Sequence, residues 1–275
     1  MKTLKYRSRG NEVFMLEEIL VNLGFDVYIS NYFGTDTRAA VIAFQQQNSL
    51  VVDGIVGPKT WSKLIEKNAS ITQFNDKFLS EADLQEFADS FDLELAAVKA
   101  VNEIESNGKG FLLDGRPRIL FEGHVFWQEL KNRGVNPLNF KNEHSKNVLY
   151  KSWTKKYYEG GEQEYDRLEK AAGLSDDDRV HDAAYCSASW GAFQIMGFHY
   201  ADLDYPNIDS FVSDMYTHEK SHLKAFGLFC KANGLLQYIR NKNWAKFAKG
   251  YNGSGYKENK YDSKLKAAYE KYLAL

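Results

Sequence analysis

The chain has 275 residues, of which 44% are hydrophobic and 26% are charged, a composition typical of one large or two moderate globular domains. A formal net charge of −2 excludes a strong overall attraction to nucleic acid or to anionic lipid. The charged start of the chain lacks the apolar core of a signal peptide, and no apolar run is long enough to cross a bilayer, so we expect synthesis as a cytosolic protein.

Cysteine and histidine usage gives no sign of a metal site. Cys186 and Cys230 are the only cysteines, and their wide spacing fits neither a disulfide framework nor a set of zinc ligands. We therefore expect two buried free thiols. His124 is predicted to be packed and hydrogen-bonded, because no histidine shares a metal-ligand motif with a carboxylate on the same helical face. No metal or cofactor is predicted.

The first 68 residues contain a weak repeat of two turn–helix units. The runs FGTDT (33–37) and VGPKT (56–60) each place a glycine and a threonine or proline before a helical segment, over 38–47 and 61–66. Before them, apolar residues at three- and four-residue steps predict an amphipathic helix over 11–23. Three short helices joined by glycine-containing turns would form a small bundle.

The segment FGTDTRAAVIAFQQQNSLVVDGIVGPKTWSKL (33–64) resembles the peptidoglycan-binding module carried by many cell-wall hydrolases. Both turn–helix units, the AFQQQN run and VDGIVGPKTW follow the order of that family, and the match covers most of residues 1–68. The resemblance implies a targeting domain over 1–68 that holds glycan strands. Residues 69–79 lack clear periodicity and are predicted to be a linker.

From Ser80 onward the periodicity is mostly helical. One helix is expected to start at Ser80, and Asp92 is predicted to cap a second that ends at Glu105. The stretch 111–153 contains prolines and glycines, and it is predicted to be irregular or to hold short strands. No βαβ alternation is present, so the fold is predicted to be mainly α. Further helical patterns cover 156–172, 181–190, 209–231, 242–250 and 258–273.

Glu105 stands at the edge of an apolar stripe on the predicted helix, and Gly108 and Gly110 would end that helix. Burial and the negative end of the helix dipole both favour the protonated form of such a carboxylate, as a general acid requires. Glu103 flanks the same stripe on its other side, and periodicity does not choose between the two. A helix-terminal glutamate without a catalytic task is the alternative.

Three later segments hold polar residues in unusual settings. The run ILFEGHVF (119–126) places Glu122 among apolar neighbours, where a carboxylate is costly to bury unless it is paired or functional. The run SWGAFQIMG (189–197) surrounds Gln194 with small residues, and KGYNGSGY (249–256) is a glycine-rich loop with Tyr251 and Asn252. The structural alternatives are a satisfied buried acid, a side chain that faces a polar groove, and a helix cap.

Taken in order, Glu-Ser after an amphipathic helix, Ser-x-Gly-x-x-Gln-Ile-Met and Tyr-Asn-Gly resemble the motifs of goose-type lysozymes and soluble lytic transglycosylases. The resemblance is closer to the N-acetylmuramidase domain of phage endolysins, where FEGHVF has a counterpart, and it covers about residues 80–275. A long insertion before the glutamine motif departs from the general lysozyme-like pattern, and it contains Glu122. The implied fold is a three-helix peptidoglycan-binding bundle followed by a larger lysozyme-like, mostly helical catalytic domain over 80–275.

The resemblance also implies residue roles. Glu105 matches the general acid that protonates the glycosidic oxygen, and the Glu-Ser match favours it over Glu103; Glu122 matches a second carboxylate. The residues expected to bind the sugar chain are Ser106, Ser189, Gly191, Gln194, Tyr251 and Asn252.

The predicted function is hydrolysis of the β-1,4 bond between N-acetylmuramic acid and N-acetylglucosamine in peptidoglycan by a modular endolysin. The alternatives are a lytic transglycosylase that uses Glu105 alone, and a non-catalytic wall-binding phage component. The expected partner is the glycan strand, not nucleic acid or a membrane, and the protein is expected to be a monomer. The resemblance implies synthesis in the host cytoplasm and action on the periplasmic wall after release by a separate membrane-permeabilising protein.

Overall fold

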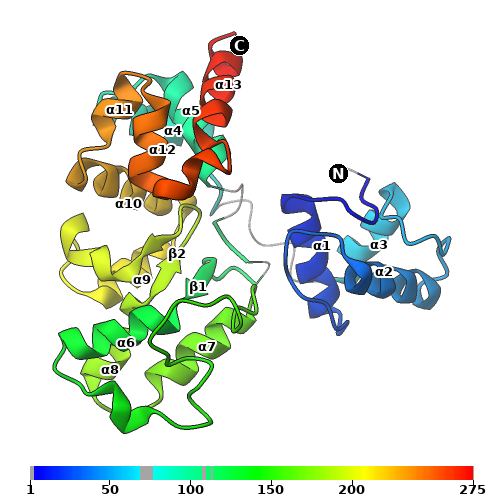
Figure 1. The fold of residues 1–275 in the computed structure, drawn as a ribbon. Helices are drawn as coiled ribbons and strands as arrows, with labels where there is room; N and C mark the ends of the chain where they lie inside the picture. Colours follow the sequence, from blue (N-terminus) through cyan, green and yellow to red (C-terminus); the bar gives the residue numbers. More distant parts are fainter. Residues whose placement is uncertain (1–2, 69–76, 107–109, 113, 275) are drawn as a thin grey trace.

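The computed structural model describes residues 3–68, 77–106, 110–112 and 114–274. A small N-terminal domain lies beside a larger domain, whose helices form two lobes above and below a short sheet (Figure 1). The prediction of a mainly α protein with a small helical bundle and a larger helical domain is confirmed. Among the described residues, no helix combines the length and the apolar character that a membrane span requires.

The N-terminal domain is the predicted three-helix bundle, formed by α1 (Asn11–Asn22), α2 (Thr35–Gln47) and α3 (Pro58–Lys67). The threonine and the proline of the two predicted turns are the first residues of α2 and α3. Proline suits that place because a first-turn residue needs no backbone donor. Apolar side chains from all three helices form one buried cluster, which includes Leu16, Leu20, Val41, Phe44, Trp61 and Leu64.

A second cluster of buried apolar side chains, between Leu84 and Leu265, forms the core of the larger domain. Two separate cores support the division into 1–68, 69–79 and 80–275, which we retain as a proposal. Residues 69–76 of the predicted linker lie outside the described residues. Its last residues rest on the larger domain, because Nζ of Lys77 donates a hydrogen bond of 2.8 Å to the Tyr216 carbonyl.

The upper lobe in Figure 1 holds the first and the last helices of the larger domain, α4 (Glu81–Phe91), α5 (Leu95–Glu105), α10 (Glu219–Ala232), α11 (Leu236–Arg240), α12 (Trp244–Asn252) and α13 (Tyr261–Leu273). The start of α4 is as predicted, because Ser80 and Asp83 form a reciprocal capping box. The helix α5 packs along α13, so the two ends of this domain's sequence meet.

Asp92 does not cap α5, so that prediction is wrong. It ends α4 in a left-handed conformation with φ of 51°, which aspartate tolerates better than most residues, and α5 begins after Glu94. The end of α5 at Glu105 agrees with the sequence pattern, whereas Gly108 lies outside the described residues.

The sheet between the lobes is antiparallel, in the order β1 (Ile119–Phe121), β2 (Ala188–Trp190) and β3 (Ile195–Met196). Below it lie α6 (Gly123–Asn132), α7 (Gln163–Ala172) and α8 (Asp178–Cys186) (Figure 1). The described residues also form the 3₁₀ helices Pro137–Phe140, Gly197–Leu203 and Ser254–Lys257, and α9 (Ile208–Met215).

Several predicted boundaries in this part are wrong. The pattern over 181–190 ends as a helix at Cys186, because the next residues pair with β1 as β2. The predicted helix 209–231 is two helices, since His218 caps α10 with its own side chain. The helix predicted from 156 begins only at Gln163, and the segment 111–153 contains the ten-residue helix α6. Both cysteines are buried free thiols, as predicted.

Candidate active site

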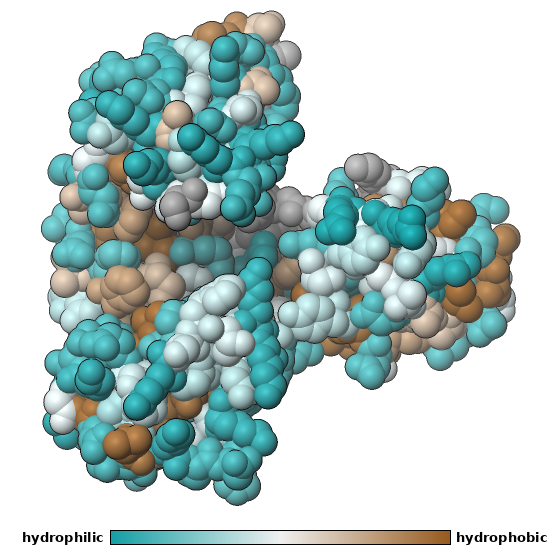
Figure 2. All heavy atoms as spheres, viewed as in Figure 1, coloured by the Kyte–Doolittle hydropathy of each residue, from teal (hydrophilic) through white to brown (hydrophobic). Residues whose placement is uncertain are grey.

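A cavity of about 320 Å³ brings together four of the predicted site residues, Glu105, Gln194, Tyr251 and Asn252. They come from the end of α5, from the turn between β2 and β3, and from the end of α12. Figure 2 shows that the surface of the larger domain is hollowed between its two lobes. The other described residues that line the cavity are Phe193, Ile195, Met196, His199, Phe229 and Tyr261.

Glu105 is almost fully buried, with 7% of its surface exposed. Nδ2 of Asn252 lies 3.1 and 3.2 Å from the two carboxylate oxygens and donates to them. Burial raises the pKa of Glu105 from its usual 4.5 to about 7, while the Asn252 hydrogen bond and the charge of Lys264 act in the opposite direction. The side chain can therefore hold a proton near neutral pH and release it to a ligand in the cavity.

Glu103 has the opposite character. Its carboxylate does not line the cavity and contacts α13, where it accepts hydrogen bonds from Nζ of Lys271 at 2.7 Å and from the hydroxyl of Tyr272 at 2.6 Å. These bonds hold its pKa below the usual value, so it is ionised at neutral pH. Of the two glutamates that periodicity could not separate, only Glu105 has the surroundings of a general acid.

Gln194 holds the turn between β2 and β3 together. It adopts the left-handed conformation with φ of 52°, and its amide oxygen accepts a hydrogen bond of 2.9 Å from the Ser189 hydroxyl. Its amide nitrogen donates to the Gly191 carbonyl at 2.8 Å. The hydroxyl of Tyr251 donates to the Phe193 carbonyl at 2.8 Å. The glutamine motif and the Tyr-Asn-Gly motif are thus joined on one wall of the cavity.

Gly191 is required where it stands. Its φ is +73°, and a Cβ there would lie 2.7 Å from the ring of His222. The His222 ring is buried, with Nδ1 accepting from the Ala192 amide at 3.2 Å and Nε2 within 2.7 Å of the Met215 carbonyl. Burial lowers the pKa of His222 to about 4, so a neutral imidazole supports this turn.

Ser106, Ser189 and Gly191 do not line the cavity themselves. The Ser106 hydroxyl donates to the Asn102 carbonyl at 2.5 Å, inside its own helix, whereas Ser189 and Gly191 act through Gln194. Sequence reasoning missed His199 and Tyr261. His199 lies just outside the glutamine motif 189–197, and nothing in the pattern of 258–273 distinguishes Tyr261 from other helix residues.

Glu122 does not line this cavity, but it lies on the face of the sheet that carries Met196, one of the residues that line the cavity. Leu120 pairs with Ser189, and Ser189 with Met196, so these side chains share one face. The pleat continues past the strand, because the Glu122 amide donates to the Ser187 carbonyl at 3.0 Å. Glu122 therefore emerges on the side of Leu120 and Ser189, opposite the buried Phe121.

The Glu122 carboxylate is nearly buried, with 13% of the side chain exposed. The Tyr158 hydroxyl lies 2.7 and 2.8 Å from its two oxygens, and Nδ1 of His124 lies 3.2 Å from Oε2. Burial raises the pKa of Glu122, and the hydrogen bond from Tyr158 and the charge of His124 oppose that rise. His124 itself packs against the Tyr150 ring, as expected from the sequence, but its Nδ1 makes the ion-pair contact with Glu122 and not the hydrogen bond that was also expected.

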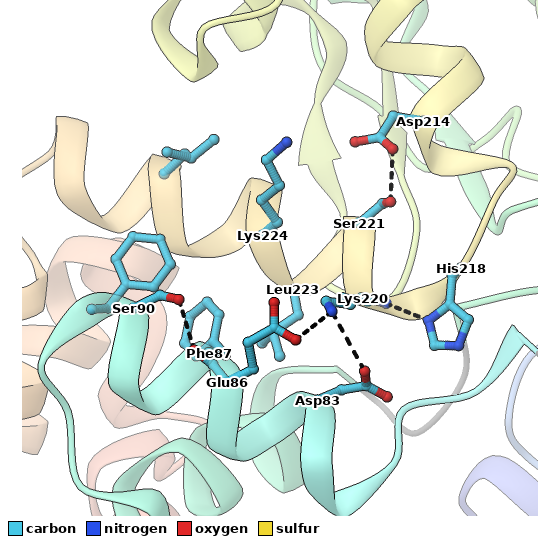
Figure 3. Close-up of a pocket in the computed structure, with 12 residues that line it drawn as sticks. Asp83, Glu86, Phe87, Ser90, Asp214, His218, Lys220, Ser221, Leu223 and Lys224 are labelled. Atoms are coloured by element: carbon cyan, nitrogen blue, oxygen red, sulfur yellow. Dashed lines mark hydrogen bonds and ion pairs between the residues drawn. The ribbon is translucent and has the colours of Figure 1, made fainter.

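A second cavity, of about 440 Å³, lies between α4 and α10 (Figure 3). Much of its lining is apolar, and each acidic side chain at its rim has an ion-pair or hydrogen-bond partner. Lys220 contacts Glu86 at 2.5 Å and Asp83 at 3.9 Å, and Ser221 donates to Asp214 at 2.7 Å. Acids held in this way are not free to protonate a ligand, so the cavity beside Glu105 is the candidate active site.

Comparison with known proteins identifies the family of the chain. Residues 94–273 match the N-acetylmuramidase family, and residues 9–64 match a peptidoglycan binding domain. The chain therefore belongs to the N-acetylmuramidase family, whose members are glycoside hydrolases acting on peptidoglycan.

Two individual relatives extend this result. The crystal structure of the Burkholderia AP3 phage endolysin is similar over 100% of both chains, with 41% identity and a TM-score of 0.68. An uncharacterized protein of Kitasatospora aureofaciens is 53% identical over 45 residues, so the chain matches 36% of the length of that relative. The resemblance to a modular phage endolysin, drawn from the sequence motifs, is confirmed.

Proposed function

We propose that the protein hydrolyses the β-1,4 bond between N-acetylmuramic acid and N-acetylglucosamine in peptidoglycan, with Glu105 as the general acid. The observation that carries the proposal is the state of Glu105: a buried carboxyl beside a cavity, with a pKa near 7 and a neutral amide as its hydrogen-bond partner. A general acid works best when its pKa is close to the pH at which the enzyme acts.

Glu122 serves in this proposal as the second carboxylate. In glycoside hydrolysis such a group either activates water or attacks the sugar, and it must be ionised to do so. Three neighbours that favour the charged form support this role, namely the Tyr158 hydroxyl, His124 and Arg167. Its position on the sheet face of Ser189 supports access to the same groove.

The amide groups around the cavity would position the sugar chain. Gln194 and Asn252 line the cavity with polar atoms, and Tyr261 adds an aromatic ring, the combination that sugar hydroxyls and sugar faces require. Ser189 and Gly191 support Gln194 in this scheme, and Ser106 supports the end of the helix that carries the acid.

The N-terminal domain is proposed to hold the glycan strand. Its own surface hollow, of about 400 Å³, is bordered by apolar and charged side chains, namely Leu50, Val51, Asp53, Ile55 and Lys59. Val51 and Ile55 are exposed there. The predicted route to the wall, by synthesis in the host cytoplasm and release through a separate membrane-permeabilising protein, stays a prediction.

A lytic transglycosylase is the second candidate. One observation favours it: among the described residues that line the Glu105 cavity, no other carboxylate is present. Such an enzyme uses one acid/base and closes the sugar onto its own 6-hydroxyl. Mass spectrometry of digested peptidoglycan separates the two, because a hydrolase leaves reducing muramic acid ends and a transglycosylase leaves anhydro-muramic ends.

The role of Glu105 is tested with Glu105→Gln. We expect lysis of permeabilised cells to fall by about 1,000-fold or more while sedimentation with purified cell walls is unchanged, since the N-terminal domain is untouched. The matched control is Glu103→Gln, which removes a neighbouring carboxylate on the same helix and should keep nearly full activity. Lysis by Glu105→Gln at the wild-type rate would remove Glu105 from the mechanism.

A further inference from the structure

One residue, Tyr158, joins the second carboxylate to the N-terminal domain. Its hydroxyl is within 2.8 Å of both oxygens of Glu122. Its backbone carbonyl accepts a hydrogen bond of 3.1 Å from the hydroxyl of Tyr28, which belongs to the N-terminal domain. The side chain and the backbone of the same residue therefore contact two different domains.

The turn that follows Tyr158 is fitted closely against the N-terminal domain. Gly160 has φ of +74°, and a Cβ on it would lie 2.7 Å from the Ile29 carbonyl oxygen. Only a residue without a side chain can make this approach. Tyr28 and Ile29 of the N-terminal domain thus contact one side of this turn.

On its inner side, the same turn is held by Glu164 of α7. One carboxylate oxygen accepts from the amides of Glu159 at 2.8 Å and Gly160 at 3.1 Å. The other accepts from the Phe121 amide at 3.1 Å and from Arg167 at 2.6 Å. Because Phe121 directly precedes Glu122, one buried carboxylate fixes both the turn of Tyr158 and the strand that carries Glu122.

A second contact between the domains lies at the other end of β1. The guanidinium of Arg118 lies over the ring of Phe14 in α1, 4.3 Å from its centroid. The carbonyl of Arg118 accepts from the Gly191 amide at 2.7 Å, so this residue is also part of the turn beside the cavity. The N-terminal domain therefore braces the site's sheet at two places.

We propose that Tyr158 is a positioning residue for Glu122, and that the N-terminal domain holds Tyr158 in place through Tyr28. This inference rests on the proposed role of Glu122 as the second carboxylate. Burial and the nearby Glu122 charge raise the pKa of Tyr158, so its hydroxyl keeps its proton and donates it to the carboxylate as a hydrogen bond. The wall-binding domain then contributes to the geometry of the catalytic groove as well as to attachment.

The charged and titratable groups around Glu122 determine the expected pH effect. Besides Tyr158 they are His124 on α6, Arg167 and Glu164 on α7, and Tyr150, which joins the network through Arg167. Tyr158, His124 and Arg167 favour the ionised carboxylate, and Glu164 opposes it. Removing the Tyr158 hydroxyl therefore raises the pKa of Glu122, and the enzyme needs a higher pH to ionise it.

The first test is Tyr158→Phe in the full-length protein, which keeps the ring and removes the donor. Release of reducing ends from purified peptidoglycan is measured as kcat and KM over the acidic and neutral range. We expect kcat to fall about 10-fold, KM to stay the same, and the acidic limb of the profile to move up by about 1 pH unit. Tyr157→Phe is the matched control on the same loop, and its profile should be that of the wild type.

The second test is Tyr28→Phe, with Tyr32→Phe as the control in the same domain, where the ring lies 4.2 Å from the Arg9 guanidinium. Amide hydrogen exchange of the turn 158–161 is measured by mass spectrometry. We expect exchange about 5-fold faster in Tyr28→Phe and a smaller upward shift of the acidic limb than in Tyr158→Phe. The control should show neither change.

Two results would overturn the inference: an acidic limb that does not move in Tyr158→Phe, or turn exchange that is unchanged in Tyr28→Phe. Glu122→Gln distinguishes this failure from failure of the proposed function. If Glu122→Gln is fully active, the second-carboxylate role is wrong. If Glu122→Gln is inactive and Tyr158→Phe keeps the wild-type profile, the role stands and the positioning proposal fails.

Discussion

The burial of Glu105 has a cost that a single substitution should reveal. Its pKa rises from 4.5 to about 7, so the folded protein binds a proton that the unfolded chain has already released over this pH window. Below pH 4.5 both states are protonated and the burial costs little. As the pH rises from 4.5 through 7, the unfolded chain ionises Glu105 more readily than the folded protein does. The free energy of unfolding therefore falls over this range.

The magnitude follows from the shift. A rise from 4.5 to about 7 corresponds to about 3 kcal/mol, because each pKa unit is about 1.4 kcal/mol. Glu105→Gln imitates the protonated form and can still accept the Asn252 hydrogen bond. We therefore compare the unfolding free energy of the variant with that of the wild type at each pH. This difference should be about 3 kcal/mol more favourable to the variant above pH 7 than at low pH.

The assay is urea unfolding followed by tryptophan fluorescence, with wild type and variant measured in parallel at a pH below 4.5 and at a pH above 7. Glu103→Gln is the control, and it should lose up to about 1 kcal/mol at the higher pH, because Glu103 has a lowered pKa and an exposed ion pair with Lys271. If the unfolding free energies of Glu105→Gln and the wild type differ by the same amount at both pH values, the pKa of Glu105 is not raised by burial.

Three further substitutions test the site's framework. Asn252→Ala removes the donor that favours ionised Glu105, so the basic limb of the activity profile should move up by about 1 pH unit, and a fixed limb would contradict this. Gly191→Ala should lower the unfolding free energy by about 2 kcal/mol, because φ is +73° and His222 blocks the Cβ; an unchanged melting temperature would argue against that constraint. Glu164→Ala should cost about 3 to 5 kcal/mol in urea unfolding by leaving Arg167 buried and unpaired, and a loss below 1 kcal/mol would be inconsistent with it.

Local sequence signals were sufficient for much of the helical fold. Amphipathic spacing located α1 and the end of α5, and Pro58 and Ser80 marked the starts of α3 and α4 through their own chemistry. These features depend on neighbours a few residues away, so they are visible in the chain itself.

Features that depend on distant partners could not be predicted in the same way. The strand β2 has three residues, too few for a period, and it becomes a strand because β1 pairs with it. Aspartate is a residue type that often caps the start of a helix. Asp92 is nevertheless separated from α5 by two further residues, and it ends α4 instead.

The candidate site also contains residues that local sequence motifs reveal and residues that depend on distant partners. Glu105, Gln194 and Asn252 belong to motifs, so they could be predicted, and the structure brings them to one cavity. Tyr158 belongs to no motif, and the helical pattern predicted from 156 forms a helix only from Gln163 onward. Its meeting with Glu122 depends on the buried Glu164 and on the N-terminal domain, which no local pattern reveals.

The packing of α5 against α13 means that the proposed active site is completed late in synthesis. Glu105 leaves the ribosome with the first half of the chain, yet its partner Asn252 lies 147 residues further on, and Tyr261 later still. At bacterial elongation rates that gap lasts on the order of ten seconds. If Glu105 is the acid, as proposed above, hydrolysis requires that synthesis has passed Asn252 and Tyr261, because both line the cavity beside it.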